Sequence, residues 1–342
     1  MINPYIGLFF LLLIVGVSFW LFRPRKGLFW QWRRARTLNQ RVMGEDALKH
    51  IHRCERYGRP ATVDSLAGAL NITGDSAASL LVELEKNELI RSEGETFRLT
   101  TEGREYALHI IRSHRLWERY LADETGFEEE AWHDRAELAE HSLTPEEADA
   151  LAAILGHPTH DPHGDPIPTA EGEMVPHGGQ PLNVLAVDMP ARIVHLEDEP
   201  EASYAQLVAE GLSPGMIVRI IESSSSRLRF WADGEEHLLV PVVAANISVV
   251  PLPDIEPEIE SGERLSVLQP GEYGEVLYIS RRSRGTERRR FLDLGILPGT
   301  RITAEINSPS GDPTAYRVRD ALLALRKEQA DMIRIKRINN GR

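Results

Sequence analysis

The chain contains one cysteine, Cys54, among its 342 residues. A single thiol excludes an intramolecular disulfide and a cysteine-rich zinc module, and it is compatible with a reducing compartment. The sequence also lacks a glycine-rich phosphate loop, and we find no nucleophile paired with a separate general base. We therefore predict that the protein is not an enzyme.

Acidic side chains are absent from the first 44 residues, which carry seven basic ones. Tyr5–Phe22 is an uncharged apolar run of about the minimum length for a bilayer span. A cleaved signal peptide is the alternative, but the basic start and small-residue cleavage site that it needs are missing. Basic residues follow the run instead, together with Trp30 and Trp32. We predict a single-pass anchor in the inner or plasma membrane, residues 1–43, with a cytoplasmic C-terminal body.

The rest of the chain is acidic, with 32 basic and 52 acidic side chains after residue 44. This balance disfavours indiscriminate binding to nucleic acid, although a locally basic face can still contact DNA. The length and the hydrophobic content of 42% are sufficient for two to four small domains.

A DNA-binding type of domain is predicted between residues 44 and 107. Helical periodicity marks Glu45–Tyr57, a short helix follows at 62–70, and a third is expected at 76–90. The next segment, RSEGETFRLTTEGRE, alternates around a turn at Gly94, as a β-hairpin does. Three helices followed by a hairpin are typical of a winged helix-turn-helix.

Residues 108–156 are predicted to be all helical, and they carry imidazoles and carboxylates with helical spacing. Residues three or four positions apart share one face of a helix, so these side chains form a stripe on each of two helices. Asp46, on the first predicted helix, adds a carboxylate. The candidate metal ligands are Asp46, His114, Glu118, His133, Glu137, Glu140 and His141.

An amphipathic helix with a polar outer face would explain any one such pair. Because the spacing recurs on two successive helices, a metal site is the better interpretation. Imidazole and carboxylate ligands without thiolate suit Mn²⁺, Fe²⁺, Co²⁺, Ni²⁺ or Zn²⁺ better than Cu⁺ or an iron–sulfur cluster.

The segment 157–181 is dense in proline and glycine and is predicted to be a loop. It contains His157, His160, Asp161 and His163. These residues could form a further metal site, or they could only cap turns.

The C-terminal half contains an internal repeat. LNVL at 182–185 corresponds to LSVL at 265–268, and GLSPG at 211–215 corresponds to GILPG at 295–299. Each copy is predicted to be a small closed β-barrel that buries its own edges.

With these motifs in order, residues 44 to about 250 resemble the diphtheria-toxin-repressor family of iron- and manganese-dependent transcriptional regulators. The resemblance rests on ALNITGDSAASLLVELEKNELIR, FRLTTEGRE, RSHRLWERYL, AWHDRAELAEHSLT and GHPTHDPHGDPIP. Both C-terminal repeats resemble the SH3-like domain of the ferrous-iron transport protein A (FeoA) type.

The resemblance implies a multidomain α+β protein. The expected parts are a transmembrane anchor (1–43), a winged helix-turn-helix (44–107), an all-helical metal-binding and dimerisation domain (108–156), a linker rich in Pro, Gly and His (157–181), a first SH3-like barrel (182–252), an acidic linker (253–262) and a second SH3-like barrel (263–338).

The resemblance also implies roles for the candidate ligands. Asp46, Glu137, Glu140 and His141 match the primary metal site of the family, and His114, Glu118 and His133 match its second site. Ser203 and Pro200 fall where iron-responsive members have ligands from the barrel, and Glu199 and Glu201 are only adjacent. Fe²⁺ or Mn²⁺ would act as corepressor of a homodimer on operator DNA, by tying the DNA-reading module to the dimerisation module.

The predicted recognition helix is acidic, with Lys86 as its lone basic side chain. Ser76 and Ser79 are its candidates for DNA contact, and Arg98 near the wing is a candidate for phosphate contact. The alternative is a membrane-tethered metal sensor or scaffold that acts on a ferrous-iron or manganese transporter through its barrels, without binding DNA.

Overall fold

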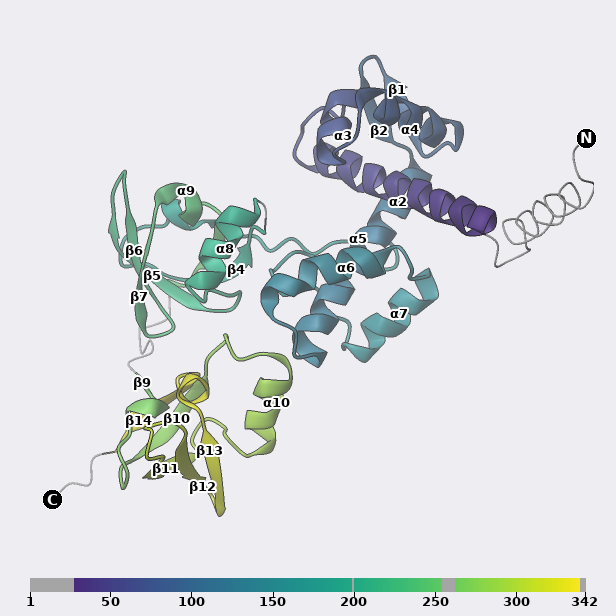
Figure 1. Ribbon diagram of the computed structural model, residues 1–342. Coiled ribbons are helices and arrows are strands. Elements are labelled where there is room, and N and C mark those ends of the chain that lie inside the picture. Colours follow the sequence, from purple (N-terminus) through teal and green to yellow (C-terminus); the bar gives the residue numbers. More distant parts are fainter. Residues whose placement is uncertain (1–27, 199, 254–261, 339–342) are drawn as a thin grey trace, which may run out of the picture. The chain divides into compact units, whose positions relative to one another are not determined.

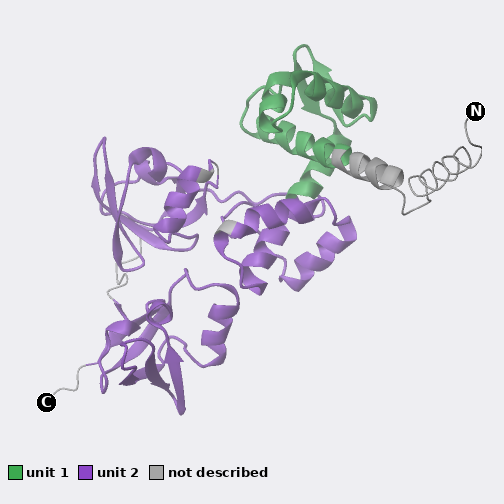
Figure 2. Ribbon diagram, in the orientation of Figure 1, with its two compact units in different colours: residues 1–111 green, residues 112–342 purple. Residues whose placement is uncertain are grey.

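The computed structural model describes residues 28–198, 200–253 and 262–338 (Figure 1). The chain divides into two compact units, residues 1–111 and 112–342 (Figure 2). The predicted transmembrane run, Tyr5–Phe22, lies outside the described residues. Among the helices that are described, none combines the length and the apolar character that a bilayer span requires.

The first unit consists of helices followed by a β-hairpin. Its elements are α2 (Leu28–Arg56), α3 (Val63–Ala69), α4 (Gly74–Lys86), β1 (Ile90–Glu93), β2 (Thr96–Leu99) and the beginning of α5 (Thr101–Glu124). Thr62 and Thr73 cap α3 and α4, because each side chain accepts a hydrogen bond from a backbone N–H three residues further on. The apolar faces of these helices and the hairpin enclose one core.

The turn between α4 and β1 differs from our prediction. We expected the third helix to continue to Ile90, but α4 ends at Lys86 because Glu88 adopts φ +58°. Ile90 instead begins β1 and is buried in the core. The turn lies against α5, where a Cβ on Gly103 would be 1.8 Å from the carbonyl oxygen of Leu89. Only glycine fits at that position.

The helical part of the second unit continues α5. A 3₁₀ turn (Glu129–Ala131) leads into α6 (Trp132–Glu140), and α7 (Pro145–Ile154) follows. Thr144 and Glu147 form a capping box at the start of α7, and Pro145 occupies its first turn.

Two β-sheet domains complete the second unit. The first contains β3 (Gln180–Pro181), β4 (Pro190–Leu196), α8 (Glu201–Ala209), β5 (Ile217–Ser223), β6 (Leu228–Ala232), β7 (Glu235–Leu239), α9 (Pro241–Ala244) and β8 (Ile247–Pro251). The second contains β9 (Glu263–Arg264), β10 (Tyr273–Ile279), α10 (Gly285–Asp293), β11 (Arg301–Asn307), β12 (Thr314–Val318), β13 (Ala321–Leu325), α11 (Lys327–Ala330) and β14 (Ile333–Arg337).

The two domains share one topology. Their strand orders, β3-β8-β4-β5-β6-β7 and β9-β14-β10-β11-β12-β13, correspond strand by strand, so the repeat in the sequence is a repeat in the fold. Each sheet surrounds its own apolar core. Among the described strand pairs, no pair closes β3 on β7 or β9 on β13, which corrects the prediction of closed barrels. The short strands β3 and β9 leave little edge to close.

The second β-sheet domain contacts the first through buried polar groups. The Ser280 hydroxyl donates to Asp233 Oδ2 at 2.5 Å, and the guanidinium of Arg334, 2% exposed, donates to the Asp233 carbonyl oxygen at 2.7 Å. The side chain of Arg282 lies against Gly211, where an added Cβ would be 2.4 Å from the guanidinium carbon.

Candidate metal site

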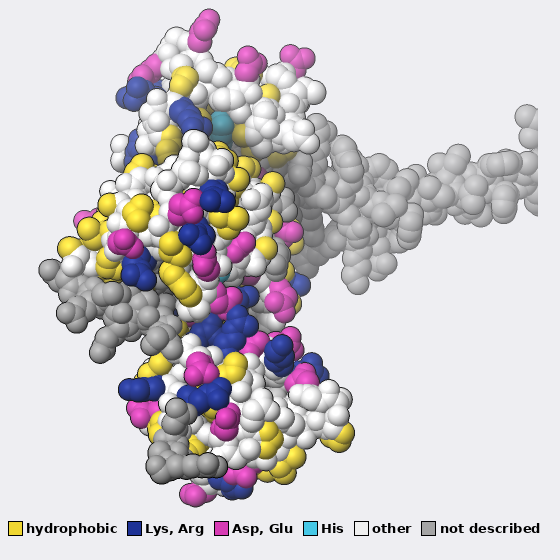
Figure 3. Space-filling view, turned by 90° about the vertical axis from the view of Figure 1, so that its left-hand side faces the viewer, with side chains coloured by type: hydrophobic (Ala, Val, Ile, Leu, Met, Phe, Trp, Pro, Cys, Tyr) yellow, Lys and Arg dark blue, Asp and Glu magenta, His cyan; other side chains and the backbone are white. Residues whose placement is uncertain are grey.

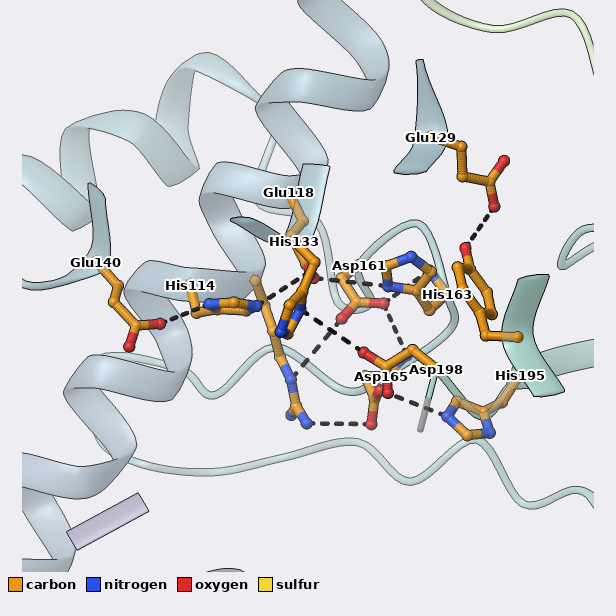
Figure 4. Close-up of polar contacts among 12 residues, drawn as sticks. His114, Glu118, Glu129, His133, Glu140, Asp161, His163, Asp165, His195 and Asp198 are labelled. Carbon is orange, nitrogen blue, oxygen red and sulfur yellow. Dashed lines mark hydrogen bonds and ion pairs between the residues drawn. The ribbon is translucent and has the colours of Figure 1, made fainter. Parts of the chain in front are cut away.

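The site is centred on the carboxylate of Glu118, which α5 places one turn after His114. His114 Nε2 lies 3.0 Å from Glu118 Oε1, and His133 Nδ1, from the first turn of α6, lies 3.3 Å from the same oxygen (Figure 4). One potential ligand atom from each of the three residues lies within 4.8 Å of the others. This separation and this donor set are compatible with one divalent ion.

A loop and the first β-sheet domain add two more groups. His163 Nδ1 lies 3.6 Å from Glu118 Oε2, and Asp198 Oδ2, in the loop after β4, lies 3.9 Å from His133 Nδ1. Glu118, His163 and Asp198 also form a group whose potential ligand atoms lie within 4.8 Å of one another. Four chain segments therefore converge on Glu118 (Figure 4).

Sequence reasoning missed Asp198. We considered the positions of Ser203 and Pro200 and the glutamates beside them, because the family pattern pointed there. The signal was present, since Asp198 directly precedes those positions. The sequence places His163 only in a possible separate site of the loop 157–181.

Glu140 lies on the other side of His114. It is fully buried at the end of α6, and its Oε2 is 2.5 Å from His114 Nδ1. His141 Nε2 is 3.4 Å from Glu140 Oε1. Glu137, by contrast, is exposed, and it belongs to no convergent group among the described residues. Asp46 belongs to the first unit, and its part in a metal site stays a prediction.

In the absence of metal, the imidazoles and carboxylates of the site stabilise each other's charged forms. Burial opposes the charge on His114, but Glu118 and Glu140 outweigh it and raise the pKa of His114 to about 9. Burial also opposes the charge on His163, and Glu118 and Asp161 overcome it, raising the pKa of His163 to about 10. The same imidazoles hold the pKa of Glu118 well below its usual range, against the effect of burial.

The donor set fits a metal ion. His163 Nδ1 is buried without a hydrogen-bond partner among the described residues, and it faces the carboxylate of Glu118. A buried polar atom without a partner is unusual in a folded protein and is consistent with a ligand position. A divalent ion would take the place of the imidazole protons, because it binds the neutral form of histidine.

A second polar network lies beside the site. The Arg115 guanidinium is 3.0 Å from Asp165 Oδ1 and 3.8 Å from Asp161 Oδ2, and His195 Nε2 is 3.4 Å from Asp165 Oδ2. Asp161 Oδ1 also accepts hydrogen bonds from the backbone N–H groups of His163 and Asp165. Asp161 therefore shapes the loop that presents His163.

The remaining histidines of the loop have other surroundings. His157 is exposed with φ +54°, and His160 Nδ1 lies 2.9 Å from the hydroxyl of Thr159. Neither belongs to a convergent ligand group in the part of the chain that the structure describes.

The candidate DNA-contacting residues lie in the first unit. The Ser76 hydroxyl lies 2.9 Å from that of Thr73, and the Ser79 hydroxyl donates to the carbonyl oxygen of Asp75, both on exposed parts of α4. Arg98, on β2, pairs with Glu93 across the hairpin at 2.7 Å and keeps 57% of its side chain exposed. All three side chains are exposed to solvent. Each also contacts a neighbouring residue of the same unit.

Comparisons with known proteins agree with this arrangement. Residues 100–169 match the family described as iron dependent repressor, metal binding and dimerisation domain, and residues 263–337 match the FeoA domain. The chain is 30% identical over 211 residues to the iron-dependent repressor IdeR of Mycobacterium leprae, which covers 57% of the chain and 90% of that protein. It is 29% identical over 185 residues to the diphtheria toxin repressor of Corynebacterium efficiens, covering 51% of the chain and 80% of that protein.

Solved structures give the same result. A manganese-dependent transcriptional repressor in complex with manganese is 26% identical, with a TM-score of 0.55, and the match covers 61% of this chain and all of that one. IdeR of T. acidophilum is 28% identical, with a TM-score of 0.50 and coverage of 61% and 97%. These relatives are repressors rather than enzymes, in agreement with our prediction that the chain is not an enzyme.

The predicted membrane location is wrong. It rested on the apolar run Tyr5–Phe22 and on the basic residues and tryptophans that follow it, whereas the relatives are repressors. A probable metal transport system membrane protein of Chlamydia pneumoniae is 42% identical over 91 residues, but the match covers only 20% of that protein and does not establish a transporter as partner of this chain.

Proposed function

The chain belongs to the family of iron-dependent repressors that includes the diphtheria toxin repressor and IdeR, and we propose that it is a dimeric, DNA-binding regulator with Fe²⁺ or Mn²⁺ as corepressor. The convergence of His114, His133, His163 and Asp198 on Glu118 carries the proposal. The manganese complex of a related repressor supports the choice of ions.

Each part of the chain has a role in this proposal. Residues 44–107 read DNA and 108–156 hold metal and dimerise, with 157–181 as their linker. Residues 182–252 and 263–338 form the two FeoA-type domains on either side of the acidic segment 253–262. The boundaries follow the sequence motifs.

We assign His114, Glu118 and His133 as metal ligands, with His163 and Asp198 completing the site. Asp198 comes from the first β-sheet domain, so a bound ion would connect this domain to α5 and α6. The ion supplies positive charge that neutralises the carboxylates. His114 Nε2, which lies beside Glu118, would bind the ion, while Nδ1 on the other side of the ring would keep its contact with Glu140.

A second ion position would use Asp46, Glu137, Glu140 and His141. Glu140 is the link between the two positions, because it contacts His114 of the first and is flanked by His141 of the second. Since Asp46 lies on α2 of the DNA-binding unit, an ion held there would bias that unit toward the conformation that binds operator.

DNA recognition is assigned to α4 and the hairpin. Ser76 and Ser79 would face base edges or phosphates, and Arg98 would give up Glu93 for a phosphate oxygen. Arg98→Glu should then weaken binding about equally across DNA sequences and reduce its salt dependence.

The test is DNA binding by the full-length chain with fragments of its own upstream region, under anaerobic conditions. Sequence-selective binding that needs Mn²⁺ or Fe²⁺, and that is lost in Glu118→Gln but kept in Asp134→Asn, would support the proposal. Asp134 is a suitable control because it is an exposed carboxylate on α6 outside every ligand group. Tight metal binding without DNA binding under any metal condition would refute the repressor function.

A further inference from the structure

The second β-sheet domain carries an unusual concentration of arginine in an acidic protein. The sequence RRSRGTERRR at 281–290 covers the turn after β10 and most of α10, and it contains a single acidic residue, Glu287. Figure 3, which draws another side of the molecule, shows Lys and Arg side chains next to Asp and Glu side chains. The chain as a whole has a net charge of −13, whereas this segment is strongly positive.

Two of these arginines are committed to contacts within the chain. Arg289 pairs with Glu124 at the end of α5 at 2.7 Å, and the Arg284 guanidinium lies 5.3 Å from the centre of the Trp132 ring. Gly285 lies so close to α5 that a Cβ would be 2.5 Å from the carbonyl oxygen of Thr125. These contacts fix the start of α10 against the helical domain.

Of the other four arginines, Arg290 lies further along α10, and Arg281, Arg282 and Arg288 have no acidic partner among the described residues. Arg281 and Arg282 are exposed, and Arg288 donates only to the backbone carbonyl oxygens of Ile279 and Ser280. No carboxylate of the described residues lies within ion-pair distance of any of the three guanidinium groups. We call Arg281, Arg282 and Arg288 the arginine patch.

Two arginines of the patch lie against one turn of the first β-sheet domain. Arg281 lies against Gly215 and Arg282 against Gly211, at the two ends of the GLSPG turn of the first β-sheet domain. Both glycines have positive φ, and any side chain at Gly211 would collide with the guanidinium of Arg282. Burial lowers the pKa of Arg288, and the nearby charge of Arg281 lowers it further. Repulsion of this kind is relieved when an anion binds between the groups.

We propose that the arginine patch binds backbone phosphates of DNA, as a contact surface separate from the winged helix. The planar guanidinium group donates two parallel hydrogen bonds to phosphate, which favours arginine over lysine at such sites. The proposal rests on the proposed function, because it needs a chain that binds DNA. The predicted recognition helix is acidic and contributes few phosphate contacts. The arginine patch would supply such contacts, which provide most of the sequence-independent affinity for DNA.

The experiment measures binding of the full-length chain, with Mn²⁺, to a mixed-sequence DNA duplex over a range of salt concentrations. The test variant is the double substitution Arg281→Gln and Arg282→Gln. The control is the double substitution Arg301→Gln and Lys336→Gln. Arg301 and Lys336 are exposed basic residues of the same domain, and both lie opposite Glu275 on the strands that flank β10.

Removal of two phosphate contacts should weaken binding by at least about tenfold at 0.1 M salt, and should make the slope of log K against log salt shallower by about two. The control should bind like the wild-type chain. Equal binding by the test and control variants would overturn the proposal and leave the repressor function intact. Loss of binding to poly-L-glutamate without a change in DNA binding would assign the patch to an acidic protein, and would also overturn it. Failure of the wild-type chain to bind any duplex with metal would remove both proposals together.

Discussion

His114 lies between two carboxylates, with Nε2 3.0 Å from Glu118 and Nδ1 2.5 Å from Glu140. Glu118 is the centre of the convergent group, while Glu140 belongs to the other set of predicted ligands. One imidazole ring thus joins the two sets, so a change in the charge at one set changes the hydrogen bonding at the other.

Glu118→Gln should lower the affinity for Mn²⁺ by at least about tenfold. Loss of a group that only orients a ligand already lowers metal affinity by about that factor, and loss of the ligand itself should lower it at least as much. Competition against a metal-binding dye measures this affinity. The matched variant Asp134→Asn removes an exposed carboxylate of α6 and should bind Mn²⁺ as the wild-type chain does. Unchanged affinity in Glu118→Gln would show that the convergent group is not the site.

Asp198→Asn tests whether the first β-sheet domain supplies a ligand. Loss of its carboxylate charge should weaken Mn²⁺ binding about tenfold, by the same reasoning. The control is Asp188→Asn, an exposed position of the same domain with φ +63° that asparagine tolerates. If the two variants bind Mn²⁺ equally well, the ion is held by α5 and α6 without the β-sheet domain.

Metal affinity should rise with pH. The pKa of His114 is about 9 and that of His163 about 10, so binding an ion at neutral pH releases protons from these rings. Calorimetry in two buffers of different ionisation enthalpy measures the protons released. A result of zero protons at pH 7 would contradict the assignment of either histidine as a ligand.

Stability of the metal-free chain should show the opposite trend. Because the pKa values of His114 and His163 are higher in the folded state than the ordinary value of 6.5, their contribution is complete below pH 6.5 and is lost as pH rises through 9 to 10. Thermal unfolding of the metal-free chain measures this loss. His163→Gln should flatten the decline, whereas His157→Ala, at an exposed position, should preserve it.

Two glycines of the first unit should respond oppositely to alanine. Gly103→Ala places a Cβ 1.8 Å from the Leu89 carbonyl oxygen, and should destabilise the unit by about 2 kcal/mol or more. Gly68 lies in α3 with open space around a Cβ, so Gly68→Ala should stabilise the unit by up to about 1 kcal/mol. Urea unfolding compares the two, and a stable Gly103→Ala chain would mean that the turn at Leu89 can move.

Local periodicity was sufficient to predict part of the group of side chains that the structure brings together. His114, Glu118 and His133 lie on two helices, and the helix repeat determines which side chains share a face. Asp198 and His163 lie in loops, whose approach to Glu118 depends on how the sheet and the helices pack, and no spacing rule reports that packing. The pattern of apolar residues also explains why the third helix was predicted to extend to Ile90, although α4 ends at Lys86. Leu89 and Ile90 continue an apolar pattern, and only the positive φ of Glu88 shows that the chain turns there.

The contact between the β-sheet domains has a practical consequence for the design of shortened chains. A chain that ends after β8 would deprive Asp233 of Ser280 and Arg334, and would uncover Gly211 where Arg282 now lies. The turn at Gly211 and the carboxylate of Asp233, which is buried in the full chain, would then be exposed to water. Fragments intended for crystallisation or binding assays are therefore better cut N-terminal to α2 than between the two repeats.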